Sequence, residues 1–332
     1  MATALTNPAQ FKAIADAIRA KTGETGTVVA NDFASKIAAI ETGIAKPRWV
    51  RRDMPTGVMW SSVCYGGGKF VTVANSSPTA AYSTDGINWT QTTLPVQTTW
   101  SSVCYGNGKF IAVANGSGTG AYSADGINWT QMTMPGSRAW TSVCYGNGKF
   151  VAVCSDSLLP AYSTDGINWS SGRLPVSAKW SSVCYGGGKF IAVASGPSTI
   201  AAYSTDGVNW TQSTLPASAE WSSVCYGGGK FVTVANSSPT AAYSTDGINW
   251  TQVTLPYKVG WYAVCYGNGK FTITASNTSI NLYSTDGINW ARISLPYTLG
   301  WRSVCYGNGK FVAMVYGASF AAYLKDSYDE WE

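Results

Sequence analysis

Hydrophobic and polar residues follow one pattern along most of the chain, and the pattern occurs seven times. Each copy reads roughly W-S-S-V-C-Y-G-x-G-K-F-V-x-V-A, then a variable loop, then A-Y-S-T-D-G-I-N-W-T and L-P. The period is 40 residues with one single-residue slip, and the opening tryptophans are Trp60, Trp100, Trp140, Trp180, Trp221, Trp261 and Trp301. A fixed period of this length is typical of propellers and solenoids.

The residue types within each copy predict four short β-strands. In the first copy the expected strands are 60–65, 69–74, 80–84 and 88–94. These runs are rich in Val, Tyr, Phe, Trp and Thr, and Gly, Asn, Asp or Pro separates them. A solenoid would need helices or long parallel coils in each repeat. We therefore expect each copy to form a four-stranded antiparallel propeller blade.

The two ends of the repeat region predict how the ring closes. Residues 48–55, R-W-V-R-R-D-M-P, align with the fourth strand of a copy, and the last copy lacks that strand. An unpaired strand edge would invite aggregation. We therefore expect an all-β, seven-bladed β-propeller of four-stranded antiparallel blades, with the ring closed by an N-terminal strand.

The first 45 residues predict a small α-helical N-terminal module. Asn7-Pro8 is suited to begin one amphipathic helix, and Asn31 to cap a second. Two short helices bury too little apolar surface to fold alone. They should pack on copies of themselves or on a partner; a disordered tail or a helical cap on the propeller is the alternative. The expected domains are 1–45, for attachment or oligomerisation, and 46–332, for the propeller.

Composition favours a binding scaffold over an enzyme. Charged residues make up 12% of the chain, histidine is absent and the net charge is +5. The lysines are spread over equivalent turns, whereas a nucleic-acid surface would need clustered basic residues, so no nucleic-acid partner is expected. No stretch predicts membrane insertion or a signal peptide.

Seven of the eight cysteines occupy one equivalent strand position, and Cys154 replaces an alanine of other copies. Equivalent positions on neighbouring blades do not suit disulfide geometry. We expect buried free thiols that act as small apolar residues rather than four disulfides. The seven equivalent positions are Cys64, Cys104, Cys144, Cys184, Cys225, Cys265 and Cys305.

The element S-T-D-G-I-N-W resembles the Asp-box of sialidase-like propellers, although it is one residue shorter between Asp and Gly. The resemblance implies a structural role, in which the aspartate holds the turn between the third and fourth strands. One carboxylate per turn offers too few hard ligands for calcium, and we expect no metal and no cofactor. The structural aspartates would be Asp85, Asp125, Asp165, Asp206, Asp246 and Asp286.

The same resemblance raises sialidase-like glycan hydrolysis as an alternative function. In that family the chemistry uses three arginines, a tyrosine helped by a glutamate, and an acidic aspartate. Within the repeats Glu220 is the only glutamate, and most aspartates belong to the turns. A hydrolytic site needs paired, individually tuned carboxylates. The sequence therefore predicts no enzymatic activity.

The whole chain is similar to bacteriophage tail fibre and receptor-binding proteins, through I-A-D-A-I-R-A-K-T-G at 14–23 and the repeats themselves. The resemblance implies a virion protein made in the bacterial host cytoplasm. Its N-terminal helices would contact tail or capsid proteins, and its propeller would bind a host cell-surface glycan or protein. A homo-oligomer is left open. A structural virion or assembly protein without a ligand of its own is the alternative.

Blade topology separates two kinds of segment. The near-identical G-x-G-K and S-T-D-G-I-N turns should lie on one face, whereas the loops after the second strands and the links before each opening tryptophan should lie on the other. Binding residues tend to lie on loops held by a rigid scaffold; loops that vary because nothing restrains them are the alternative. The expected ligand-binding residues are Arg138, Lys179, Glu220, Tyr257, Lys258, Tyr297 and Tyr316.

Overall fold

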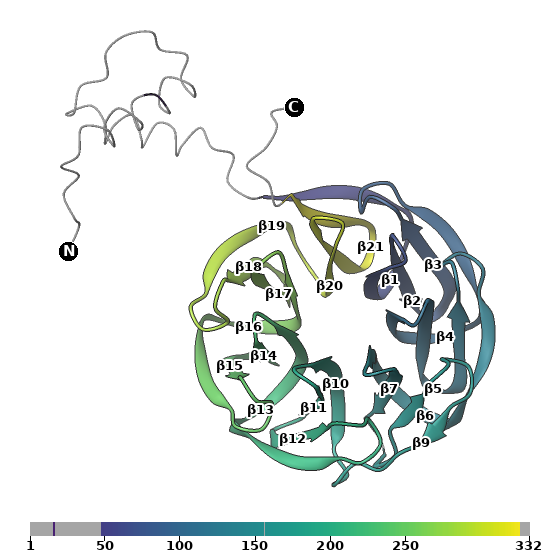
Figure 1. The fold of residues 1–332 in the computed structure, drawn as a ribbon. Helices are drawn as coiled ribbons and strands as arrows, with labels where there is room; N and C mark the ends of the chain where they lie inside the picture. The colour runs from purple at the N-terminus through teal and green to yellow at the C-terminus, as the bar shows by residue number, and fades with distance from the viewer. Residues whose placement is uncertain (1–15, 17–47, 156, 326–332) are drawn as a thin grey trace, which may run out of the picture. The chain divides into compact units, whose positions relative to one another are not determined.

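The computed structural model describes residues 16, 48–155 and 157–325 (Figure 1). The chain divides into two units, Met1–Arg48 with Ser327–Glu332, and Trp49–Asp326. Every strand belongs to the second unit. Apart from Asp16, the expected helical module of residues 1–45 lies outside the described residues.

All regular elements between residues 48 and 325 are β-strands, arranged around a common centre (Figure 1). In chain order they are β1 Trp49–Gly66, β2 Lys69–Asn75, β3 Ser77–Ser83, β4 Thr90–Gly106, β5 Lys109–Ser123, β6 Thr130–Gly146, β7 Lys149–Cys154, β8 Ala161–Ser163, β9 Ser170–Ser171, β10 Lys179–Gly186, β11 Lys189–Ser195, β12 Ser198–Ser204, β13 Thr211–Gly227, β14 Lys230–Asn236, β15 Ser238–Ser244, β16 Thr251–Gly267, β17 Lys270–Ser276, β18 Thr278–Ser284, β19 Ala291–Leu299, β20 Trp301–Gly307 and β21 Lys310–Lys325.

The expected fold class is wrong in its details. Instead of seven separate four-stranded blades in a closed ring, the described strands form two open sheets, of 11 and 10 strands. The first sheet runs from β20 and β21 through β1 to β9, and the second from β10 to β19. Among the described strands, no ladder joins β9 to β10 or β19 to β20. The fold is all-β and propeller-like.

The sheets continue from copy to copy because the fourth strand of one copy and the first strand of the next form one element. In β4 the strand passes through Pro95 without a break. The partner of Thr79 is Thr93 but the partner of Ser77 is Thr98, so extra β4 residues bulge out of the ladder around the proline. A bulge tolerates proline because its residues need not donate to the ladder.

The two sheets end where this continuity fails. Between β9 and β10, residues 172–178 form no named strand. Gly172 and Leu174 donate backbone hydrogen bonds to Pro160 and Leu158, and Arg173 makes an isolated parallel bridge to Asn209. Between β19 and β20 the single residue Gly300 interrupts the strand. The third copy therefore departs most from the common pattern.

β1 pairs with β21 along its first residues. Trp49 lies opposite Leu324 and Asp53 lies opposite Phe320. The Trp49 side chain is buried, and its indole N–H donates to Asn281 Oδ1 at 3.1 Å. This hydrogen bond joins β1 to β18, 232 residues later in the chain.

The core is repeated along the chain. Each opening tryptophan is fully buried and lies in its own hydrophobic cluster, as Trp60 does with Phe70 and Met54. Tyrosines join successive copies, since the ring of Tyr105 covers Gly66 so closely that a Cβ atom on this glycine would lie 2.0 Å from the ring. The same contact recurs between all neighbouring copies, and it includes Tyr65 on Gly307. Only glycine fits beneath these rings.

Candidate functional site

The S-x-D-G turns form a hydrogen-bonded unit that is the same in six copies. In the first copy, Asp85 Oδ1 accepts hydrogen bonds at 2.8 Å from the Ser83 hydroxyl and from the amides of Ile87 and Asn88. Its Oδ2 accepts from the Asn88 side chain at 2.8 Å. The Ser83 oxygen in turn accepts from the Gly86 amide at 2.8 Å. The carboxylate is therefore occupied within its own turn.

These hydrogen bonds also set the acidity of the aspartates. Desolvation acts to raise the pKa of Asp85, but the amides of Asn88 and Ile87 and the side chains of Asn88 and Ser83 outweigh it and lower the pKa to about 2. In Asp165 the Asn168 and Ile167 amides dominate, and the pKa also lies well below its usual range. A carboxylate held ionised in this way is suited to fixing a turn.

No disulfide joins any of the eight cysteines, as the sequence analysis predicts. Cys64 is half-buried, and desolvation raises the pKa of its thiol. Desolvation likewise raises the pKa of Cys265, to about 12, although hydrogen bonding with the Tyr306 and Tyr266 backbone acts to lower it. Thiols with raised pKa values are poor nucleophiles and poor metal ligands.

The strand register brings the variable segments together. Asn75, at the end of β2, lies opposite Met59 in the link before Trp60, and Ser77, at the start of β3, lies opposite Thr98 in the next link. Equivalent pairings recur in other copies, including Glu220 with Asn236 and Thr278 with Leu299. We call the loops after the second strands, together with these links, the variable surface.

The predicted ligand residues do not form one site on this surface. Arg138 turns back onto its own link, where it donates to the Pro135 carbonyl and lies 5.6 Å from the Trp140 ring centre. Lys179 is exposed opposite Ser195.

The other predicted residues are also spread around the surface. Tyr257 is half-buried beside Arg292, and Lys258 is exposed. Tyr297 is 44% exposed and packs against Phe320. The structure brings only Tyr316 and Glu220 near the groove described next.

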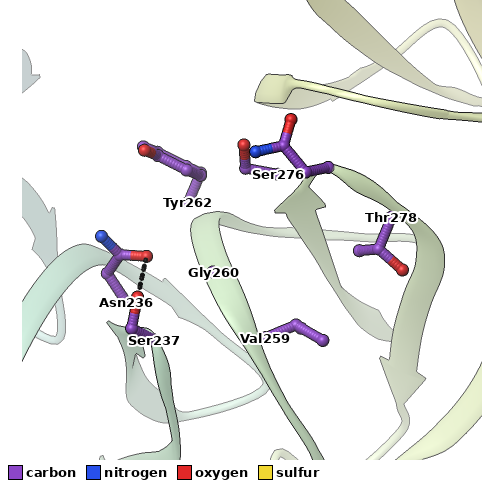
Figure 2. A pocket seen from close by; sticks show the side chains of 8 residues that line it. Asn236, Ser237, Val259, Gly260, Tyr262, Ser276 and Thr278 are labelled. Atoms are coloured by element: carbon purple, nitrogen blue, oxygen red, sulfur yellow. Dashed lines mark hydrogen bonds between the residues drawn. The ribbon is translucent and has the colours of Figure 1, made fainter.

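An open groove of about 400 Å³ lies on the variable surface (Figure 2). Its side chains are mainly amides and hydroxyls, and Figure 2 shows Tyr262 between Asn236 and Ser276. Gly260 is one of the lining residues, and a Cβ atom on it would come within 2.9 Å of Asn236 Oδ1. The absence of a side chain at Gly260 therefore leaves space for the Asn236 side-chain amide. The lining residues are Asn236, Ser237, Val259, Gly260, Tyr262, Ser276, Asn277 and Thr278.

Tyr262 is also part of an aromatic stack with an arginine, which we call the arginine stack. The Arg302 guanidinium lies over the Tyr262 ring, 4.3 Å from its centre, and over the Tyr316 ring, 4.6 Å from its centre. The side chain of Arg302 is exposed, and the structure of residues 48–325 records no ion pair for it. The stack combines an accessible cation with two aromatic surfaces.

Tyr262 and Arg302 stand where the first five copies have serine or threonine. There the hydroxyl donates to the carbonyl of the next opening tryptophan, as Ser61 does to Trp100 at 2.7 Å. Equivalent bonds of 2.6 to 2.8 Å follow in the next four copies. The sixth and seventh copies have exchanged this structural hydroxyl for large side chains that project onto the variable surface.

A second hydroxyl is missing at the same joint. In six joints a serine hydroxyl accepts a hydrogen bond from a valine amide of the next copy, as Ser62 does from Val103 at 3.1 Å. The sixth copy has Ala263 instead, so the Val304 amide has no such serine. The joint between the sixth and seventh copies therefore lacks both hydroxyl bonds. Sequence reasoning missed this site because it searched the loops, but aligning the repeats would have shown it.

The structure offers few other sites for chemistry. Among the described residues, no three His, Cys, Asp or Glu side chains are grouped so that they could hold a metal ion. In the described part of the chain, no helix is long and apolar enough to cross a membrane.

Comparison with known proteins agrees with the propeller-like fold. Residues 55–176 match the model of a family described as DUF6242 beta propeller domain. The chain therefore contains a β-propeller domain. No curated protein matches it.

Solved structures with a similar fold include enzymes. The structure of virginiamycin B lyase from Staphylococcus aureus has a TM-score of 0.77 at 11% identity, covering 84% of this chain and 99% of that chain. YCF48 from Cyanidioschyzon merolae has a TM-score of 0.63 at 14% identity, covering 84% and 98%. YCF48 bound to D1 peptide has a TM-score of 0.68 at 14% identity, covering 84% and 95%. Such low identities show the fold alone.

The expectation that the chain is not an enzyme is overturned by these comparisons, because a fold that carries a lyase does not exclude catalysis. A histidine-to-alanine variant of that lyase is catalytically inactive. The present chain contains no histidine. None of its own side chains can therefore take the place of the lyase histidine as a histidine.

Proposed function

We propose that this protein is a receptor-binding protein of a bacteriophage virion and that it binds a host cell-surface glycan in the groove beside Tyr262. The similarity of the repeats and of residues 14–23 to phage receptor-binding proteins supports the virion assignment. In this proposal the N-terminal 45 residues attach the protein to tail or capsid proteins.

The observation that carries the proposal is the exchange of structural hydroxyls for the arginine stack. Each lost hydroxyl bond costs about 0.5–1.5 kcal/mol, and an exposed cation–π contact returns about 0.5–1 kcal/mol. These magnitudes are similar, so stability gives no clear reason for the exchange to Tyr262 and Arg302. Departures of this kind are expected at functional sites.

The chemistry of the groove suits a saccharide. Sugars present hydroxyl groups and flat faces of C–H bonds, and they are bound by a few placed polar groups beside aromatic rings. Asn236, Ser276 and Thr278 provide amide and hydroxyl groups, and Tyr262 provides a ring. Because Gly260 has no side chain, a ligand can approach the Asn236 amide.

The test is binding of the full chain to an array of bacterial surface polysaccharides. Tyr262→Ser installs the residue found in most other copies, so it should fold, and it should lose most of the array signal. Tyr283→Ser is the matched control, because Tyr283 is an exposed tyrosine of the same copy that does not line the groove. The proposal fails if the wild-type chain binds no polysaccharide, or if both variants bind as well as the wild type.

A peptide ligand is the second candidate, favoured by one observation. A propeller of similar fold, YCF48, has been solved bound to D1 peptide. A wild-type chain that captures peptides from a random display library through Tyr262, while ignoring the polysaccharide array, would favour this candidate.

A further inference from the structure

We propose that the arginine stack is an anion subsite, which holds a carboxylate or phosphate group of the glycan bound in the groove. This inference rests on the proposed function and adds the chemical class of the ligand. It would make the receptor an acidic polysaccharide.

The geometry of the stack leaves Arg302 ready to bind an anion. Guanidinium faces pack well against aromatic rings, whereas the N–H groups lie in the guanidinium plane and along its edge. Arg302 Cζ lies over both rings, 4.3 Å from the centre of Tyr262 and 4.6 Å from the centre of Tyr316. A guanidinium stacked on aromatic rings can still use its N–H donors to bind two oxygens of one carboxylate or phosphate side by side.

The charges around the groove agree with this assignment. Arg302 is exposed and has no ion pair recorded among residues 48–325, so its charge is available to a ligand. Glu220, in the link before the fifth copy, lies opposite Asn236 in the strand register. It would repel an anion from the fifth-copy side, whereas Arg302 attracts one from the seventh. The two charges therefore fix the direction in which an acidic glycan lies.

Comparison between copies shows that the subsite is specific to one place. The first five copies have only a short hydroxyl where Arg302 stands, and that hydroxyl bonds to the neighbouring backbone. Gly260 and Gly300 precede Trp261 and Trp301, whereas the other copies carry larger side chains before the tryptophan. The space and the cation occur together only at the sixth and seventh copies.

The experiment measures binding of the full chain to two matched pairs of saccharides. One pair is an oligogalacturonate and its carboxyl-reduced form, and the other is a phosphorylated mannan oligosaccharide and its dephosphorylated form. The acidic member of at least one pair should bind about 10- to 100-fold more tightly than its neutral partner, as expected for charge-assisted hydrogen bonds. Added salt should reduce the preference.

Two variants separate the subsite from general positive charge. Arg302→Ser, which installs the residue of other copies, should abolish the preference for the acidic member. Lys310→Ser removes one charge from the start of β21, where Lys310 lies opposite Gly307 at the end of β20. This variant should keep the preference. A melting curve shows that each variant is folded.

The outcomes distinguish the two proposals. Equal binding of acidic and neutral members, or a preference that survives Arg302→Ser, overturns the anion subsite while glycan binding stands. If the wild-type chain binds none of the four saccharides and no polysaccharide on the array, glycan binding fails and the subsite fails with it.

Discussion

Replacing Ala263 with serine should stabilise the protein, because it restores a hydrogen bond that six other joints contain. In those joints a serine Oγ and a valine amide nitrogen lie 3.0 to 3.2 Å apart, within the ordinary range for N–H···O bonds. Ala263 is half-buried and packs in the cluster around Trp301. The added oxygen would face the amide of Val304 as it does in every other copy.

The expected gain is about 0.5–1.5 kcal/mol, the usual net value of such a bond. Urea unfolding followed by tryptophan fluorescence should show a higher midpoint with an unchanged slope, and the melting temperature should rise by roughly 1–3 °C. Ser223→Ala is the mirror control, since it removes the equivalent bond to Val264, of 3.2 Å, and should destabilise by a similar amount. An Ala263→Ser protein that is no more stable than wild type, beside a destabilised Ser223→Ala protein, would refute the reasoning.

Three further predictions follow from buried and hydrogen-bonded groups. Asn281→Ala should destabilise by about 1–3 kcal/mol in urea unfolding, because it leaves the buried Trp49 indole N–H without its acceptor; an unchanged midpoint would contradict this. The pKa of Asp85 is lowered to about 2, below the value of about 3.9 in unfolded chains. The turns should therefore contribute fully to stability above about pH 4 and lose this contribution as the pH falls toward 2. The test is the urea midpoint measured against pH, and a midpoint that does not change with pH would contradict the prediction. Denatured, unreduced protein should titrate eight thiols with Ellman's reagent. The native protein should react slowly, because desolvation raises the pKa of thiols such as that of Cys265. A titration of fewer than eight thiols in the denatured protein would indicate disulfides.

Much of the local structure could be predicted from the repeats. Alternating apolar residues and the turn residues predicted the strands. The Asp85 carboxylate accepts hydrogen bonds from amides of its own turn. The sheet pattern could not be predicted in this way. Pro95 was expected to end a strand, but a bulge accommodates it and the strand continues to Gly106. Strand continuity depends on register, which the residue pattern of one copy does not contain.

The candidate site was harder to predict, because it is marked by two strand residues that depart from the repeat pattern and not by an unusual loop. The sequence analysis predicts aromatic and charged loop residues such as Tyr257 and Tyr297 as ligand-binding residues, but neither lines the groove. Tyr262 and Arg302 lie within the strands that the repeats make look alike. The two residues can be recognised as a candidate site only when the hydroxyl hydrogen bonds of the other copies are known, since these bonds show which structural contacts were replaced.

The contact between the tyrosine of one copy and the glycine of the copy before it has a consequence for how such a protein changes over generations. Every copy carries the same two halves of this contact, so any copy fits beside any other. Exchange of one 40-residue copy for another would therefore keep this contact while it replaced a whole set of loops. The surface of such a protein can thus vary by exchange of entire copies as well as by single substitutions.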